Sequence, residues 1–185
     1  MNAANKAAII VSKIIEVFHW VGAALLAAAT VCAKAAPDKI GLFVGFDAKE
    51  CCGAELNVYG FEVQAAVVNG SVDMTAFFLF GIGGTLILLL MAMVFRNLHL
   101  ILKASAAGSP FRADNIRMLK EIGVFSVAVP LVGFVMSIVI RLVLGPDAAE
   151  ISVDQAGLFM GLIILCLTRY FMYGAQLEEE VDGLV

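Results

Sequence analysis

The most constraining feature of this sequence is the length of its runs without charge. Asp73 and Arg96 enclose 22 uncharged residues, and Glu121 and Arg141 enclose 19. A helix needs about 20 apolar residues to cross the hydrocarbon core of a bilayer, so both runs predict membrane-spanning helices. The composition agrees, because 62% of the 185 residues are hydrophobic and 15% are charged. These values exclude a disordered, collagen-like or nucleic-acid-binding chain and favour an integral membrane protein.

Two further segments predict spans that each carry one ionisable group. Residues 13–34 are apolar between their terminal lysines apart from Glu16, and residues 155–176 are apolar between their terminal glutamines apart from Arg169. The expected fold is an all-α integral membrane protein, an antiparallel four-helix transmembrane bundle in one domain, residues 1–185. The expected spans are about 8–34, 74–101, 117–144 and 151–174, with an outer loop at 35–73, an inner loop at 102–116 and an inner tail at 175–185.

The distribution of Lys and Arg predicts the orientation. An even number of spans places both termini on one side, and that side holds eight of the 12 basic residues. Because basic residues mark the cytoplasmic side, we expect a multi-pass protein of the cell (inner) membrane with both termini in the cytoplasm. The acidic excess of the other side argues against an anionic outer partner. The first span also has a signal-peptide pattern, but its length and its internal Glu16 and His19 argue against cleavage.

The outer loop carries two local patterns. Residues 55–64 alternate apolar and polar side chains around Tyr59-Gly60, which predicts a β-hairpin that caps the bundle on its extracytoplasmic side. Cys51 and Cys52 follow Cys32 on the same side, where oxidation is possible. The sequence leaves two alternatives: a disulfide between Cys32 and either Cys51 or Cys52, or free thiols at all three residues. Neither histidine lies on that side, so we expect no metal, and nothing in the sequence indicates another cofactor.

An intramembrane polar cluster of Glu16, His19 and Arg169 is the first candidate site. At 100° per residue, Glu16 and His19 share a helix face with small residues, which favours burial of that face against other helices. Arg169 falls at roughly the same depth in the fourth span, so we hypothesise a Glu16–Arg169 ion pair. Such a pair either only fixes packing or belongs to a proton or ligand site in which His19 titrates near neutral pH.

A second candidate site consists of motifs after the second and fourth spans. The inner-loop motif is Asn97-Leu98, Ser109-Pro110-Phe111, Asp114-Asn115 and Leu119-x-x-Ile122-Gly123, and the tail motif is Tyr173-Gly174 followed by Leu177-x-x-Glu180-x-Asp182. Over residues 95–182 the chain resembles the four-span bacterial membrane proteins grouped as domain of unknown function 2975. The resemblance implies no established activity. It does imply a small helix-turn-helix regulator as the cytoplasmic partner, although Gly183 stands where that family usually has Thr or Ser.

The residues favour two functions over catalysis. The sequence offers no nucleophile with a base, no metal cluster and no facing carboxylates, so we expect no enzyme. The first expectation is a non-enzymatic sensor or regulatory partner of a cytoplasmic helix-turn-helix transcription regulator, without direct nucleic-acid binding. The second is a small transporter subunit or immunity protein that uses Glu16, His19 and Arg169. Besides the lipid bilayer, a second copy of the chain in a homo-oligomer is the remaining partner to consider.

Overall fold

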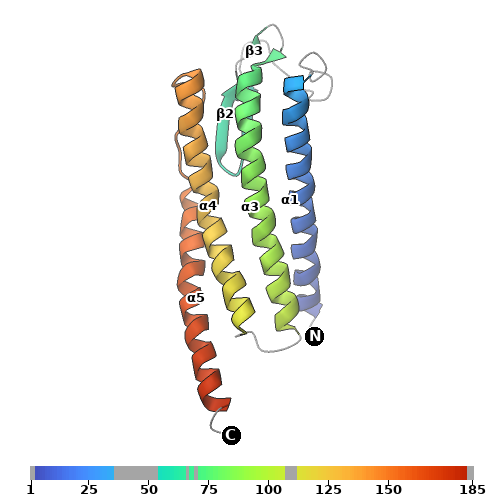
Figure 1. Cartoon of the computed structure of the whole chain (residues 1–185), viewed down its shortest axis with the longest axis vertical. Helices are drawn as coiled ribbons and strands as arrows, with labels where there is room; N and C mark the ends of the chain where they lie inside the picture. The colour runs from blue at the N-terminus through green and yellow to red at the C-terminus, as the bar shows by residue number, and fades with distance from the viewer. Residues whose placement is uncertain (1–2, 36–53, 66, 69–70, 107–111, 183–185) are drawn as a thin grey trace. The chain divides into compact units, whose positions relative to one another are not determined.

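A computed structural model describes residues 3–35, 54–65, 67–68, 71–106 and 112–182 (Figure 1). Its helices are α1 (Ala3–Ala35), α3 (Met74–Ser105), α4 (Ala113–Leu144) and α5 (Gln155–Asp182). All four are long and apolar enough to cross a membrane, so the four long apolar helices that the sequence predicts are present. The largest difference is in α5, which begins four residues later than predicted and continues eight residues further.

The helices carry their apolar side chains on the outside. On α1 the exposed side holds Phe18 and Leu25, which are 77% and 66% exposed, whereas Ala23 on the other side is 2% exposed. Large apolar residues outside and small residues at helix contacts are typical of helices packed within lipid. At the start of α3, the Asp73 carboxylate accepts a hydrogen bond of 2.8 Å from the Thr75 backbone N–H, which caps that helix.

A β-hairpin precedes α3. Strand β1 (Ala54–Val58) pairs antiparallel with β2 (Phe61–Ala65), and Val58 stands opposite Phe61. The intervening Tyr59 and Gly60 have φ values of 50° and 77°, as a two-residue type I′ turn requires. The hairpin predicted around these two residues is therefore confirmed. Strands β3 (Val67–Val68) and β4 (Ser71–Val72) form a second two-stranded sheet.

The segment after α4 adds to the hairpin. The Gln64 backbone N–H donates to the Ala148 carbonyl at 2.8 Å, and Ala149 forms an isolated bridge with Val63. Val63 and Ala149 are 0% and 3% exposed. The edge of β2 that faces away from β1 is thus hydrogen-bonded to the segment that connects α4 and α5.

The described chain forms two compact units. We call Met1–His19, Leu90–Ala128 and Gln155–Val185 the polar-core unit, and Trp20–Leu89 with Val129–Asp154 the hairpin unit. Helices α1, α3 and α4 each contribute to both units, whereas α5 belongs to the polar-core unit alone. The hairpin unit therefore combines the sheet with parts of three helices.

Glycines set the close helix packing inside each unit. In the hairpin unit, a Cβ added at Gly81 would overlap the Thr30 hydroxyl, and one at Gly84 would lie 2.8 Å from Leu26. The later glycine on α3 thus contacts the earlier residue on α1, so these two helix parts run antiparallel. In the polar-core unit, Gly123 of α4 and Gly161 of α5 pack in the same way. Gly81 and Gly84 of the sequence Gly81-x-Gly83-Gly84 therefore serve helix packing.

The hairpin lies along α3 and does more than cap its end. Phe61 is 1% exposed, its ring stacks on that of Phe80 with centroids 5.6 Å apart, and a Cβ at Gly83 would lie 2.8 Å from it. At the other side of the turn, Val58 lies 3.5 Å from where a Cβ of Gly84 would stand. The predicted cap is therefore corrected in its position, because the apolar face of the hairpin is buried where α3 glycines leave room.

Candidate functional site

The buried side chains of the polar-core unit are mainly polar. In the described part of this unit, the buried hydrophobic residues are Ala92 and Ile122. The buried polar residues, each 3–6% exposed, are Ser12, Glu16, His19, Asn97, Asn115 and Thr168. Buried polar groups are costly without partners, so their concentration in one unit makes this region the candidate site.

Glu16 is the buried charge of this site. It shares one face of α1 with Ser12 and His19, which lie four residues before and three residues after it. Lys13 Nζ donates to Glu16 Oε1 at 2.9 Å, and the side chains of Lys13 and Glu16 are 51% and 7% exposed. Glu16 Oε2 is buried and has no hydrogen-bond partner in the described part of the chain. The carboxylate is thus compensated at one oxygen only.

Arg169 does not belong to this site. It is exposed on α5, and among the described residues no ion pair joins it to Glu16. The predicted Glu16–Arg169 pair is not formed, because Arg169 is exposed on α5 whereas Glu16 is buried. The partner of Glu16 is instead Lys13 of the same helix, at the i, i+3 spacing. The spacing of Lys13 and Glu16 was visible in the sequence and could have indicated this pair.

His19 is buried as predicted, and it helps to join α1 to α3. Its Nδ1–H donates to the Ile15 carbonyl at 2.8 Å, which places a proton on Nδ1 because a carbonyl can only accept. The ring stacks on Phe95 with centroids 5.3 Å apart. On α3, His99 Nδ1–H donates to the Ile9 carbonyl at 3.1 Å. His99 was outside the predicted cluster, although it is the second histidine of the chain.

Asn97 of the inner-loop motif joins α3 to α4. It is 4% exposed, and its Nδ2 donates to Glu121 Oε2 at 2.9 Å. Arg117 Nε donates to the other oxygen of Glu121 at 3.2 Å. Both Glu121 oxygens are therefore paired, in contrast to those of Glu16. The i, i+4 spacing of Arg117 and Glu121 is the sequence signal that could have found them.

The other described members of the inner-loop motif divide between the interior and the surface. Asn115 is buried, and its Nδ2 lies 3.4 Å from the Ser105 hydroxyl. Gly123 is buried, and an added Cβ would meet Leu165 of α5 at 2.7 Å. Asp114 is exposed and Leu119 is half-buried. Ser109, Pro110 and Phe111 lie outside the described residues.

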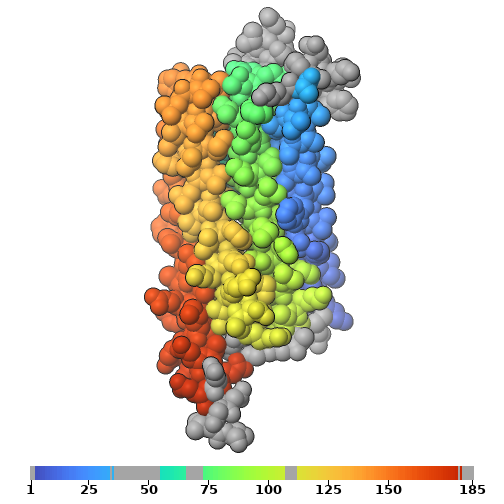
Figure 2. Space-filling model, viewed as in Figure 1, coloured from blue at the N-terminus to red at the C-terminus, as the bar shows by residue number. Residues whose placement is uncertain are grey.

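The tail motif lies on α5. Gly174, Leu177 and Glu180 are within the helix, and Asp182 is its last residue. Leu177 is 45% exposed, and Glu180 is exposed. In the space-filling view, the last turns of α5 (red) extend beyond the beginning of α4 (yellow), both in the polar-core unit (Figure 2). The predicted inner tail is therefore helical as far as Asp182.

The cysteine and metal predictions fall largely on residues that the structure does not describe. Cys32 is exposed and has no disulfide partner among the described residues, whereas Cys51 and Cys52 lie outside them. The bridge from Cys32 to one of them stays a prediction. Within the described ranges, no group of three or more His, Cys, Asp or Glu side chains is placed to hold a metal ion.

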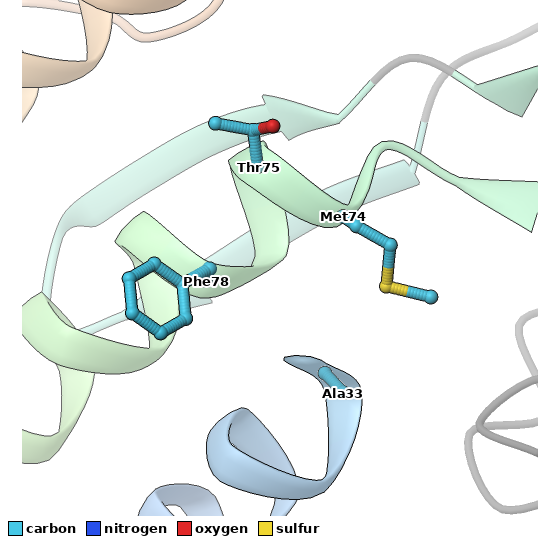
Figure 3. Close-up of a pocket in the computed structure, with 4 residues that line it drawn as sticks. All are labelled: Ala33, Met74, Thr75 and Phe78. Carbon is cyan, nitrogen blue, oxygen red and sulfur yellow. The ribbon is translucent and has the colours of Figure 1, made fainter. Parts of the chain in front are cut away.

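Two hollows lie in the hairpin unit. The first, of about 270 Å³, is lined by Ala33 at the end of α1 and by Met74, Thr75 and Phe78 at the start of α3 (Figure 3). None of the described residues that line it is charged. The second, of about 410 Å³, lies between the hairpin and the end of α4 and is lined by Gln64, Ala65, Asp73, Ala76, Leu144, Asp147 and Ala148.

Comparison with known proteins gives no relative. No family model matches this chain, and no curated protein and no solved structure is significantly similar to it. The resemblance to domain of unknown function 2975 therefore stays a prediction.

Proposed function

We propose that the protein is a non-enzymatic, multi-pass membrane protein that acts as the regulatory partner of a cytoplasmic helix-turn-helix transcription regulator. Its four helices form an antiparallel transmembrane bundle with both termini in the cytoplasm. Four long apolar helices support the insertion. The excess of Lys and Arg on the side of the termini supports the orientation. The nature of the regulator follows from the family resemblance.

The helical end of α5 is the observation that carries this proposal. In its last turns, Glu178 and Glu180 are exposed, and Leu177 places an apolar side chain among them. An acidic helix with an apolar contact residue complements a basic protein surface, and DNA-binding domains present such a surface. By occupying it, the end of α5 would hold the regulator at the membrane and away from DNA.

Co-purification with a helix-turn-helix regulator, which the family resemblance places in a neighbouring gene, tests the proposal. The full-length tagged protein is extracted in mild detergent, and the recovered regulator is quantified. We expect the double variant Glu178→Lys/Glu180→Lys to recover at least roughly tenfold less regulator, which corresponds to a loss of about 1.4 kcal/mol of binding free energy. The matched control, Glu150→Lys, makes the same change at an exposed residue before α5 and should recover as much as the wild type. Equal recovery with all three proteins contradicts the proposal.

A second candidate is a small transporter subunit or an immunity protein. The buried Glu16, with one oxygen unpartnered in the described part of the chain, is the observation that favours it, because intramembrane charges commonly mark substrate or proton pathways. His19 belongs to this site, whereas Arg169 does not. Uptake or killing assays with Glu16→Gln and His19→Gln test it, with Arg169→Gln as the control that should keep full activity. Unchanged activity in all three variants contradicts this candidate.

A further inference from the structure

The hairpin turn lies beside the middle of an apolar helix. Val58, next to the turn, packs at Gly84, the eleventh of the 22 uncharged residues that follow Asp73. At 1.5 Å per residue, the eleven residues from Asp73 to Gly84 span about 17 Å along α3. This distance is a little more than half the thickness of a hydrocarbon core of about 30 Å.

The two faces of the hairpin differ in polarity. Its inward face, with Leu56, Phe61, Val63 and Ala65, is 0–7% exposed. Its outward face consists of two cross-strand pairs, Glu55 opposite Gln64 and Asn57 opposite Glu62. Asn57 Nδ2 donates to Glu62 Oε1, and Glu55, Asn57 and Gln64 are exposed.

The helices of the same unit show the opposite pattern. Leu25 of α1, Leu86 of α3 and Val135 of α4 are 66%, 45% and 54% exposed. These side chains suit lipid. The outward face of the hairpin does not, because a carboxylate at the centre of a bilayer costs about 2.5–3.5 kcal/mol or more. Non-helical backbone at this depth must be buried in protein or line a water-filled cavity.

We propose that the outward face of the hairpin lines a water-filled, acidic vestibule, which opens to the outer side and reaches the middle of the membrane. This inference rests on the membrane insertion proposed above. The hollow of about 410 Å³ supports it, since Asp73, Asp147 and Gln64 line its wall and no described Lys or Arg does. Near the turn, Asp154 Cβ lies 3.6 Å from where a Cβ of Gly60 would stand. Carboxylates of one sign in a low-dielectric cleft concentrate cations over anions.

Cysteine accessibility in the full-length protein tests the vestibule. In a background where the four native cysteines are replaced by serine, single cysteines are placed by Asn57→Cys on the outward face and by Leu86→Cys on the lipid-facing side at the same depth. Intact cells are treated with membrane-impermeant thiol reagents of opposite charge. We expect Asn57→Cys to react roughly tenfold faster than Leu86→Cys. We also expect the ratio of the reaction rates with the cationic and the anionic reagent to be about tenfold higher at Asn57→Cys than for a small thiol in solution. The additional substitution Glu62→Gln should lower this ratio.

Each outcome of this experiment is decisive. Protection of both cysteines overturns the vestibule and leaves membrane insertion intact. Equal and rapid labelling of both overturns the insertion itself. Rapid labelling of Asn57→Cys without a preference for the cationic reagent overturns the acidic character of the vestibule. Glu55→Cys is the second reporter on the outward face. It must give the same result as Asn57→Cys, with folding of each variant checked by a single symmetric elution peak in detergent.

Discussion

At the scale of single residues, Glu16 and Glu121 show two ways of placing a carboxylate in an apolar helix. Glu121 has a donor at each oxygen, Asn97 on α3 and Arg117 on its own helix. Glu16 has Lys13 at one oxygen and is more deeply buried, with its side chain 7% exposed against 35% for Glu121. An incompletely paired buried charge opposes folding, so Glu16 is the residue at which stability and function are expected to conflict.

Substitution of these two residues by leucine should therefore change stability in opposite directions. Glu16→Leu removes a poorly compensated charge, and Lys13 can extend to water because it is 51% exposed. We expect the free energy of unfolding to stay equal or rise by about 1–3 kcal/mol. Glu121→Leu leaves the buried Asn97 amide without its acceptor, so we expect the free energy of unfolding to fall by about 1–3 kcal/mol. Equilibrium unfolding in detergent micelles measures both. A loss of stability in Glu16→Leu equal to that in Glu121→Leu would show that Glu16 only fixes packing.

At the scale of the elements, helix contacts in the hairpin unit depend on glycines whose neighbours leave no room for a side chain. Gly81 meets Thr30 so closely that a methyl group would overlap the hydroxyl. The hydroxyl itself is fixed by donating to the Leu26 carbonyl at 2.7 Å. By contrast, Gly22 has open space up to Leu88, 3.8 Å from an added Cβ. The same pair of helices thus contains one glycine that is sterically required and one that is not.

Alanine at these two glycines gives a matched comparison. Gly81→Ala should lower the free energy of unfolding by about 1–3 kcal/mol through overpacking. Gly22→Ala should leave it unchanged or raise it by up to about 1 kcal/mol through better helix propensity. Thermal unfolding in detergent measures both, and Thr30→Ala should recover part of the loss in Gly81→Ala. Equal effects of the two alanines would argue against the close approach of α1 and α3.

The hairpin gives a prediction of its own. Phe61→Ala removes a fully buried ring that stacks on Phe80, so it should cost about 3–5 kcal/mol of unfolding free energy. Gln64→Ala, on the exposed side of the same strand, should change it by no more than about 0.5 kcal/mol. Denaturation in detergent distinguishes the two. A small loss in Phe61→Ala would mean that the hairpin does not pack on α3.

Sequence patterns predicted local structure better than contacts between elements. The alternation around Tyr59-Gly60 predicted the hairpin and its turn because both depend on neighbouring residues. The packing of Phe61 on Gly83 was not predictable, since nothing local links a strand to a glycine of a later helix. The partner of Glu16 was missed for a related reason. Equal depth suggested Arg169, but depth does not place two side chains on facing sides of their helices.

At the scale of the whole molecule, the two units contain different cores. The hairpin unit buries Phe61, Val63, Ile87 and Ile140 at 0–1% exposure, whereas the polar-core unit buries mainly polar groups. Apolar packing gives stability without fixing a chemical role, and buried polar groups are retained where a function needs them. The described chain thus separates a stabilising unit from the unit that holds the candidate site.

Reporter fusions test the proposed orientation of the whole chain. A fluorescent protein that matures only in the cytoplasm should fluoresce when fused to either terminus. Alkaline phosphatase, which is active only outside the cytoplasm, should be active when inserted at Asp147, an exposed residue between α4 and α5, and inactive when fused after Val185. The reverse pattern would contradict the orientation derived from Lys and Arg.

The burial of Phe61 has a consequence for the biogenesis of the protein. Its side chain packs at Gly83 of α3 and lies near Gly133 of α4, but the ribosome makes the hairpin before either helix. The apolar face of the hairpin is therefore fully covered only after about 70 further residues, up to Gly133, have been synthesised. Contacts so distant in sequence form slowly. Docking of the hairpin is thus expected to be the last step of folding, and the step at which newly made chains are most exposed to aggregation and proteolysis.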